Sequence, residues 1–240
     1  MSRGYGQYCP LALSVELLCQ RWTVLVISRL LDGFTKFNEI HRGVPRISPS
    51  LLSQRLQELE DAGIIKRKKL KGQKGYSYHL TAAGKDLNGI VDQMAVWGQQ
   101  WARDMEHEDL DPAFLAWSMH LRMNSSAMPP GRTVLQFEFS GTPREFKRFW
   151  LVNNDDTVEM CLKNPGFEPD LCVNADIRLF IEAWRGFRDL RKEINARRIR
   201  LTGPAGLKKA FPDWLLLSSL SPFERLRGGR EARLARQLNR

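Results

Sequence analysis

Six basic side chains gather in a stretch of nine residues that contains no acidic residue; they are Lys66, Arg67, Lys68, Lys69, Lys71 and Lys74. Clustered cations attract phosphate groups, so this stretch could bind the backbone of a nucleic acid. A solvated surface or a disordered tail would have the same composition. Strand-like runs on either side of the turn Gly72-Gln73-Lys74-Gly75 predict that the stretch is a β-hairpin.

The segment before the hairpin carries the signals of a capped helix. Ser48 supplies the oxygen that an N-cap needs, and Pro49 suits the first helical position. Leu52, Leu56 and Leu59 then recur at helical spacing and form one apolar stripe. The other side chains are polar and almost uncharged: Ser50, Ser53, Gln54 and Gln57, with Arg55 at the border. Hydroxyl, amide and guanidinium groups can hydrogen-bond base edges in a DNA major groove, although Arg55 could instead pair with Glu58 on its own helix.

A polar, capped helix directly followed by a basic hairpin is the layout of a winged helix-turn-helix. Segments 10–19, 21–31 and 35–42 have the apolar spacing of the helices that would precede it. We therefore expect double-stranded DNA as a partner. The expected contacts come from the six cations of the hairpin and, on the helix, from Ser48, Ser50, Ser53, Gln54 and Arg55.

The composition bounds the class of protein. The chain has 240 residues, 42% of them apolar, which allows one large or two ordinary globular domains. Residues 1–104 hold 15 basic and 9 acidic side chains, residues 105–223 hold 16 of each, and residues 224–240 hold 6 and 2. This uneven charge predicts different partners for the two halves. The chain has no run of 18 apolar residues and residues 1–10 lack a signal-peptide pattern, so we expect no membrane span and a cytoplasmic protein.

Catalysis and metal binding are not indicated. The four histidines lie outside any recognisable catalytic motif, and the cysteine spacing fits neither a zinc site nor a disulfide scaffold. Cys9 could be a thiol switch or a small buried apolar residue. We interpret Cys19, Cys161 and Cys172 as packing residues. The expectation is a protein that is not an enzyme and needs no cofactor.

A long helix is predicted to start at Thr81. Its apolar residues trace one face for several turns: Leu87, Ile90, Val91, Met94, Trp97 and Trp101. This face could simply close the core of the first domain. We favour a homodimer interface that also uses Leu11, because aromatic anchors are enriched at interfaces and a twofold protein matches a twofold operator.

The second half reads as α+β. Residues 104–112 are acidic and predict a linker, followed by a helix over 111–123. Alternating apolar residues then predict antiparallel strands over 132–140, 146–152, 157–162 and 170–174. A helix over 177–184 with Asp176 as its cap, a strand over 198–201 and a helix over 211–220 complete one antiparallel-rich sheet with a face covered by helices. The predicted domains are 1–105 and 110–222. A basic tail over 223–240 could be an amphipathic helix, a frayed end or an extra phosphate contact.

An ordered series of motifs runs through the first 105 residues: Cys9-Pro10, Arg21-Trp22-Thr23, Phe37-Asn38-Glu39-Ile40, Ile47-Ser48-Pro49, Leu52-Ser53-Gln54-Arg55-Leu56, Glu58-Leu59-Glu60, Ala62-Gly63-Ile64-Ile65 and Leu80-Thr81-Ala82-Ala83-Gly84. In these motifs the sequence resembles the HxlR-type transcriptional regulators, a winged helix group related to the MarR proteins. The resemblance implies a homodimeric DNA-binding regulator, and in some members a cysteine placed like Cys9 senses oxidants or electrophiles. Two features depart from the family pattern. Cys19-Gln20 stands where a glycine is usual, and the hairpin is more basic, which suggests stronger phosphate contact and weaker sequence dependence.

A second set of motifs lies in residues 110–222: Leu135-Gln136-Phe137-Glu138-Phe139, Phe149-Trp150-Leu151-Val152, Val158-Glu159-Met160-Cys161-Leu162, Asn164-Pro165-Gly166-Phe167, Asp170-Leu171-Cys172-Val173 and Leu201-Thr202-Gly203-Pro204. These are similar to the sterol-carrier-protein-like domain that follows this regulator in some fused proteins. The resemblance implies an apolar cavity for a hydrophobic ligand. Candidate lining residues, which could equally be plain core, are Phe137, Phe149, Trp150, Phe180, Trp184 and Trp214.

Three functional hypotheses follow from the sequence. The favoured one is a homodimeric DNA-binding regulator whose second domain senses a hydrophobic small molecule. An alternative is a lipid-binding or carrier protein that uses the winged domain for protein contacts. Another is a thiol-regulated repressor that senses through Cys9 without a ligand.

Overall fold

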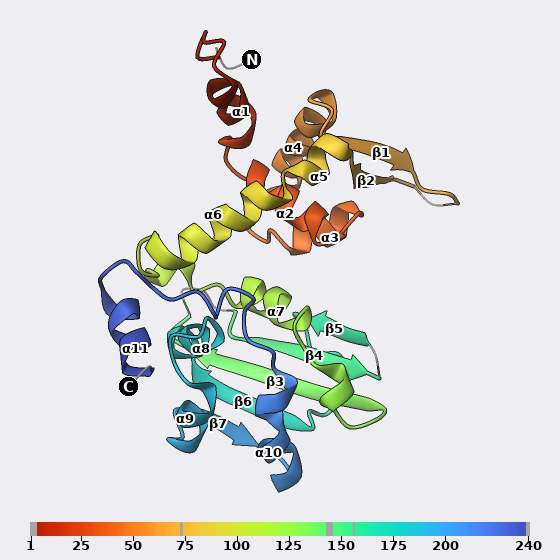
Figure 1. The fold of residues 1–240 in the computed structure, drawn as a ribbon. Helices are drawn as coiled ribbons and strands as arrows, with labels where there is room; N and C mark the ends of the chain where they lie inside the picture. Colours follow the sequence, from red (N-terminus) through yellow and green to blue (C-terminus); the bar gives the residue numbers. More distant parts are fainter. Residues whose placement is uncertain (1–3, 73, 143–145, 156, 239–240) are drawn as a thin grey trace. The chain divides into compact units, whose positions relative to one another are not determined.

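The computed structural model describes residues 4–72, 74–142, 146–155 and 157–238. The chain divides into two compact units, Met1–Met94 and Ala95–Arg240 (Figure 1). The division falls inside one helix, so this helix contributes residues to both units. Each unit is described by itself below.

The first unit is a winged helix-turn-helix, as the sequence predicts. Its helices are α1 (Pro10–Leu18), α2 (Thr23–Leu31), α3 (Phe37–Arg42) and α4 (Pro49–Asp61), followed by strands β1 (Ile65–Lys69) and β2 (Tyr76–Leu80) and by α5 (Ala82–Asp86). Ile27, Ile40, Leu52, Leu56 and Leu59 form the centre of the core and are almost completely buried. The three leucines of α4 thus occupy the face that their spacing predicted.

The junction between α1 and α2 is a sharp turn built on Trp22. This residue has φ 79° and ψ −21°, a left-handed conformation that is unusual for a residue with a large side chain. The two helices are bent by 84° at this break. Among the described residues no single helix is long and apolar enough to cross a membrane. The bent pair α1 and α2, taken together, has the length and the apolar composition of a membrane span.

The sequence predicts one long helix from Thr81. This prediction is wrong in one respect, because the structure divides the segment into two helices. Helix α5 ends at Asp86, and α6 runs from Asn88 to Trp101. Asn88 and Gly89 are both poor helix formers, which accounts for the break at this point. Thr81 does cap the first piece, since its hydroxyl accepts a hydrogen bond from the Gly84 N–H at 3.2 Å.

The second unit contains a five-stranded sheet in the order β5-β4-β3-β6-β7. The strands are β3 (Arg132–Ser140), β4 (Arg148–Asn154), β5 (Thr157–Cys161), β6 (Leu171–Asp176) and β7 (Ile199–Thr202). Three neighbouring pairs are antiparallel, so the sheet is antiparallel-rich as predicted. The pair formed by the central strand β3 and its neighbour β6 is parallel, with Leu135 opposite Leu171 and Phe139 opposite Ala175. The expectation that all strands pair antiparallel is therefore wrong, because the segment between β5 and β6 crosses to the far side of β3.

Helices cover one face of this sheet. The main core combines β3 and β4 with α7 (Pro112–His120), α8 (Ile177–Trp184) and α10 (Ala205–Trp214). Asp176 caps α8 by accepting a hydrogen bond from the Leu179 N–H at 3.1 Å, as predicted. Two short 3-10 helices, η1 (His107–Asp109) and η2 (Ser125–Ala127), and two further helices, α9 (Leu190–Asn195) and α11 (Arg230–Leu238), complete the unit.

Two segments at the edges of this unit differ from the sequence-based expectations. The predicted helix over 211–220 ends at Trp214, and the chain beyond it is extended and pairs with residues 122–124, where Leu216 N–H donates to the Arg122 carbonyl at 3.0 Å. Residues 104–112 and 223–238, which we interpreted as a linker and a tail, also pack within the second unit. Arg225 is buried there and pairs with Asp104 at 3.2 Å.

Candidate nucleic-acid interface

Helix α4 presents its polar side chains to solvent. Ser48 caps the helix by accepting a hydrogen bond from the Leu51 N–H at 3.3 Å, and Ser50, Ser53 and Gln54 are exposed. These residues lie in the N-terminal half of the helix. Recognition helices contact base edges chiefly through N-terminal residues. The arrangement therefore suits base recognition at the N-terminal end of α4.

The C-terminal half of α4 carries acidic residues that hold neighbouring side chains. Gln54 donates to Glu58 at 2.9 Å, and Gln57 donates to Asp61 at 2.8 Å. Arg55 donates to Glu58 at 2.5 Å and to the Arg21 carbonyl at 3.0 Å. The Arg55 side chain is only 11% exposed, so in this conformation it connects α4 to the start of α2.

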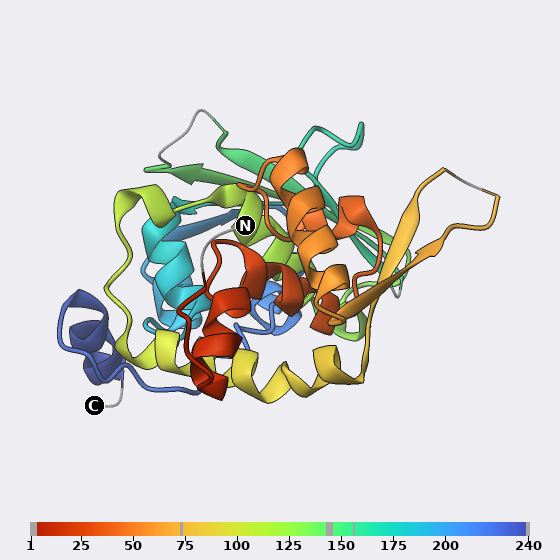
Figure 2. The ribbon, with the colours of Figure 1, turned by 90° about the horizontal axis from the view of Figure 1, so that it is seen from above.

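The basic hairpin, hereafter the wing, consists of β1 and β2 in the register that pairs Lys69 with Tyr76. Residues 66–69 are exposed along β1, and Lys71 and Lys74 are exposed in the turn; Gln73 lies outside the described residues. Figure 2 shows the hairpin projecting beyond the helices of the first unit. Five cations, Lys66, Lys68, Lys69, Lys71 and Lys74, are thus available to solvent around its length.

Arg67 differs from the other wing cations because it holds the wing against α4. Its guanidinium pairs with Glu60 at 3.1 Å and donates to the Gln57 side chain at 3.4 Å, and its N–H donates to Glu60 at 3.2 Å. It also lies 5.0 Å from the centre of the Tyr76 ring. Residue 67 lies on the wing, so no helical spacing joins it to residues 57 and 60 of α4, and the sequence did not indicate this connection.

The base of the wing is tied to the start of α3. Tyr78 N–H donates to the Thr35 carbonyl at 2.8 Å, and Lys36 pairs with Ser77 as a short antiparallel bridge. Burial raises the pKa of the Tyr78 hydroxyl, because the phenolate would be desolvated. The wing is therefore held at both α3 and α4, which fixes its orientation relative to the polar face of α4.

The predicted dimer residues separate into two groups. Leu87 packs against the core of the first unit together with Val91. In contrast Leu11, Ile90, Met94, Trp97 and Trp101 are exposed, and Trp97 is 61% exposed. Ile90, Met94, Trp97 and Trp101 follow helical spacing along α6 and so form one stripe.

None of the four cysteines is in a disulfide bond. Cys9 is exposed at the N-cap of α1. Cys19 is also exposed, so the interpretation of this residue as a packing residue is wrong; it lies at the end of α1 rather than inside the helix. Cys161 and Cys172 are partly buried on the sheet. Within the described part of the chain, no group of histidine, cysteine and carboxylate side chains could hold a metal ion.

The six predicted ligand-pocket residues are core residues. Phe137 stacks on Phe149 with ring centres 4.9 Å apart and meets Phe180 edge-on at 5.9 Å. Trp184 and Trp214 belong to the same cluster. Trp150 points to the opposite face of the sheet, where it packs with Val134 and Val152. These residues therefore fill two cores rather than face one shared space.

The C-terminal arginines have a structural role that the sequence did not identify. Arg225 donates to the carbonyl oxygens of Gln99, at 2.9 Å, and Ala102, and it pairs with Asp104 and Glu231. The N–H groups of Leu226 and Arg227 donate to the Gln100 carbonyl at 3.0 and 2.9 Å. The last carbonyls of α6 are thus satisfied by residues 225–227. Arg230 pairs with the buried Glu182 at 2.8 Å, and Arg240 lies outside the described residues.

Comparison with known proteins identifies the first half of the chain. The HxlR-like helix-turn-helix family matches residues 17–106. The HTH-type transcriptional regulator YvaP of Bacillus subtilis is 34% identical over 112 residues, which cover 46% of this chain and 96% of YvaP. The HTH-type transcriptional regulator YodB of the same organism is 36% identical over 95 residues, covering 39% of this chain and 85% of YodB. A crystal structure of quinone-bound YodB aligns with a TM-score of 0.34 and 36% identity over 38% of this chain and 96% of that one.

The match to YvaP includes nearly the whole of that regulator, and the family match includes α2 to α6 with the wing between them. The chain therefore belongs to the HxlR-like helix-turn-helix family of transcriptional regulators.

Proposed function

We propose that this protein is a homodimeric transcriptional regulator that binds double-stranded DNA through α4 and the wing, and that its second unit binds a hydrophobic small-molecule effector. The observation that carries the DNA-binding part is the exposed polar N-terminal half of α4 beside a wing with five solvent-exposed lysines. Lysines of the wing would contact phosphates and supply affinity that depends on salt. Ser50, Ser53 and Gln54 would contact base edges and supply discrimination, at about 1–3 kcal/mol for each good bidentate pair.

The homodimer is supported by the apolar stripe on α6. Exposed tryptophans are rare on a surface without a partner, and aromatic residues are enriched at interfaces. The stripe Ile90, Met94, Trp97 and Trp101 is exposed in the single chain, as is Leu11 on α1. A second copy that covers these residues would give the twofold symmetry that palindromic operators require.

Coupling between an effector and DNA would pass through α6. Arg185, at the end of α8, donates two hydrogen bonds to the Gln99 side chain of α6, at 3.1 and 2.8 Å. Arg225 holds the carbonyl of the same Gln99 at 2.9 Å. The other end of α6 packs Val91 into the core of the first unit. A movement of α8 would therefore displace the helix that carries the dimer stripe.

The direct test is selection of a binding sequence from random duplexes, followed by fluorescence anisotropy on the selected site at physiological salt. We expect a specific complex, and Gln54→Ala should reduce affinity for the selected site about tenfold while leaving affinity for random DNA unchanged. Gln237→Ala changes an exposed glutamine on α11, outside α4 and the wing, and is the matched control. A protein that merely carries a lipid would give no specific complex in this assay.

A second candidate mechanism is thiol regulation through Cys9. It is favoured by the exposure of Cys9 and by the relative YodB, which has been crystallised with a quinone. Quinones are electrophiles that add to thiolates. Treatment with a quinone should then release DNA from the wild type but not from Cys9→Ser, whereas Cys19→Ser, which removes the other exposed thiol, should respond as the wild type does.

A further inference from the structure

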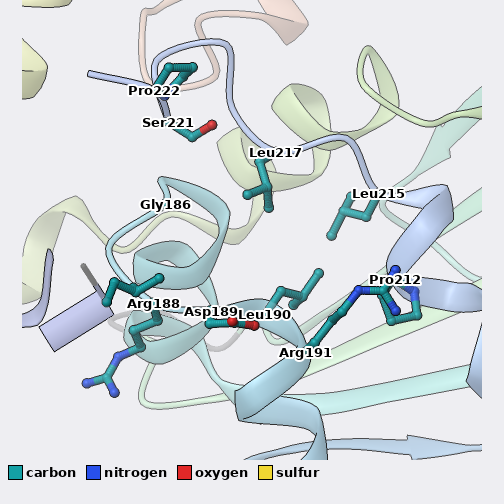
Figure 3. Close-up of a pocket in the computed structure, with 11 residues that line it drawn as sticks. Gly186, Arg188, Asp189, Leu190, Arg191, Pro212, Leu215, Leu217, Ser221 and Pro222 are labelled. Atoms are coloured by element: carbon teal, nitrogen blue, oxygen red, sulfur yellow. The ribbon is translucent and has the colours of Figure 1, made fainter. Parts of the chain in front are cut away.

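A cavity of about 420 Å³ lies at the edge of the main core of the second unit, which shares Leu190 and Leu215 with its lining (Figure 3). It is open to solvent on one side and is lined by the turn after α8, the start of α9, the end of α10, residues 215–222 and the end of α11. Its volume falls within the range of small-molecule sites. The apolar part of its lining consists of Leu190, Pro212, Leu215, Leu217, Pro222 and Leu238.

Backbone contacts hold the walls of this cavity in place. Gly186 has φ 80°, and a Cβ at this position would lie 2.8 Å from the Ser221 Cβ, so the turn after α8 can rest directly on the 218–222 turn only with glycine there. Ser218 N–H also donates to the Trp184 carbonyl at 3.0 Å. The cavity is therefore formed before any ligand arrives, which limits the entropy lost on binding.

Three charged residues line the cavity, and two of them are committed to other groups. Arg188 pairs with Glu182 at 2.7 Å and with Glu193 at 3.3 Å, and Figure 3 shows its side chain directed away from Leu215 and Leu217. Asp189 caps α9 by accepting a hydrogen bond from the Lys192 N–H at 3.0 Å. The third residue, Arg191, is the cation that a ligand in the cavity could reach.

Among the described residues, the side chain of Arg191 has one polar partner, Asp213, and both members of this ion pair are exposed. Its guanidinium lies 2.5 Å from Asp213, and the two side chains are 57% and 61% exposed. Pairs this exposed contribute little, because water screens the charges and both side chains lose freedom. An incoming carboxylate can therefore take the place of Asp213 on Arg191 at small cost.

We propose that this cavity binds an amphipathic anion, whose apolar body lies against the leucines and prolines and whose carboxylate pairs with Arg191. This inference rests on the proposed effector-binding role of the second unit, and it gives that role a location and a head-group chemistry. The site is distinct from the aromatic residues named from the sequence. Arg188 and Leu238 connect it to α8 and α11, the helices that hold the end of α6.

The test is calorimetric titration of the full chain with decanoate, decanol and decylamine below their micelle concentrations. Decanoate should bind, decanol should bind more weakly, and decylamine should bind weakest. Arg191→Gln should weaken decanoate about tenfold and leave decanol unchanged. Lys192→Gln removes the same charge from the same helix outside the cavity, and it should change neither ligand.

Asp213→Asn should change decanoate affinity in the direction opposite to Arg191→Gln. It removes the carboxylate that competes for Arg191, so decanoate should bind severalfold more tightly. Leu217→Trp fills the apolar part and should abolish binding of all three compounds while the circular dichroism spectrum is retained. The surface variants at 191, 192 and 213 decide the outcome even where Leu217→Trp does not fold. The proposal is overturned if no compound binds, if Arg191→Gln and Lys192→Gln behave alike, or if Asp213→Asn weakens decanoate.

Operator affinity measured on the same samples separates this inference from the proposed function. Decanoate binding without any specific DNA complex would leave the cavity assignment intact and refute the regulator proposal. Specific DNA binding without decanoate binding would leave the regulator proposal intact and refute the cavity assignment.

Discussion

The guanidinium of Arg225 donates to the main-chain carbonyl oxygen of Gln99 at 2.9 Å, across 126 residues of sequence. The same side chain is buried, and it also meets Asp104 at 3.2 Å and Glu231 at 3.4 Å. A buried cation with two carboxylates and two carbonyl oxygens is a structural group rather than a surface charge. It fixes the end of α6 within the second unit.

Removing Arg225 should therefore destabilise the second unit strongly. Arg225→Ala removes one of the two arginine partners of the buried Glu231, which keeps Arg185 at 3.5 Å, and it takes a donor from the Gln99 carbonyl. Breaking a buried pair costs up to about 3–5 kcal/mol. Arg227→Ala removes an exposed arginine from the same segment and should have little effect. Urea unfolding followed by tryptophan fluorescence would measure both, and equal losses for the two variants would contradict this role of Arg225.

The wing cations should not be equivalent in DNA binding. Lys68→Gln removes an exposed cation, so the slope of log affinity against log salt should decrease by about 0.9. Arg67→Gln removes a cation that already pairs with Glu60 at 3.1 Å, so it should lower affinity by loosening the wing while the slope stays nearly constant. Anisotropy titrations at several salt concentrations would distinguish the two. A larger slope change for Arg67→Gln would show that Arg67 leaves Glu60 for a phosphate.

The stripe on α6 predicts how the proposed dimer can be broken. Trp97→Asp places a charge at the most exposed aromatic residue of the stripe, and loss of such an anchor costs at least about 2 kcal/mol, or on the order of thirtyfold in the dimer Kd. Phe114→Asp changes an exposed aromatic residue on α7 in the same way and should leave the Kd unchanged. Sedimentation equilibrium would measure both, and a monomeric wild type would refute the homodimer.

The ion pairs around Glu193 predict an acid-sensitive second unit. Burial alone would raise the pKa of Glu193, but hydrogen bonds from Arg198 and Arg188 outweigh it and hold the pKa below its ordinary value. Because the folded pKa is the lower one, the stabilisation is present above the ordinary glutamate pKa and is lost as pH falls through the folded value.

The unfolding free energies of the wild type and of Glu193→Gln should accordingly differ at pH 7 by about 1.5–3 kcal/mol and converge as pH falls below the folded-state pKa of Glu193. The exposed Glu159→Gln on β5 is the matched control and should follow the wild type at every pH. A constant difference across the range would mean that packing rather than charge explains the effect.

Local signals in the sequence are sufficient to predict most helices and the hairpin of the first unit. Ser48, Pro49 and the leucines of α4 act within one helix, and the glycines at 72 and 75 act within one turn, so neighbouring residues determine both elements. The wing's attachment through Arg67 and Glu60 could not be predicted, because it depends on how the hairpin folds back on α4.

In the second unit local patterns predict the strands but not how the strands pair or how the side chains pack. Strand positions followed from alternation, but the parallel pairing of β3 with β6 joins residues such as Phe137 and Val173 that no local pattern connects. The aromatic residues were recognised as inward-facing, yet whether they surround a space or fill one depends on packing distances. The arginines at 225 and 230 resembled a basic tail because composition does not reveal that Glu231 and Glu182 are buried beside them.

The capping of α6 by residues 225–227 also orders the events of synthesis on the ribosome. All the core residues of the first unit have been made once Val91 is in place, so this unit can fold while the remainder is still being translated. The second unit is complete only after Arg225 and Glu231 have emerged, because Arg225 pairs with Asp104 at 3.2 Å and Glu231 accepts a hydrogen bond from the Met105 N–H at 2.9 Å. A ribosome stalled between these two points would present a folded winged helix-turn-helix beside an unfinished second unit.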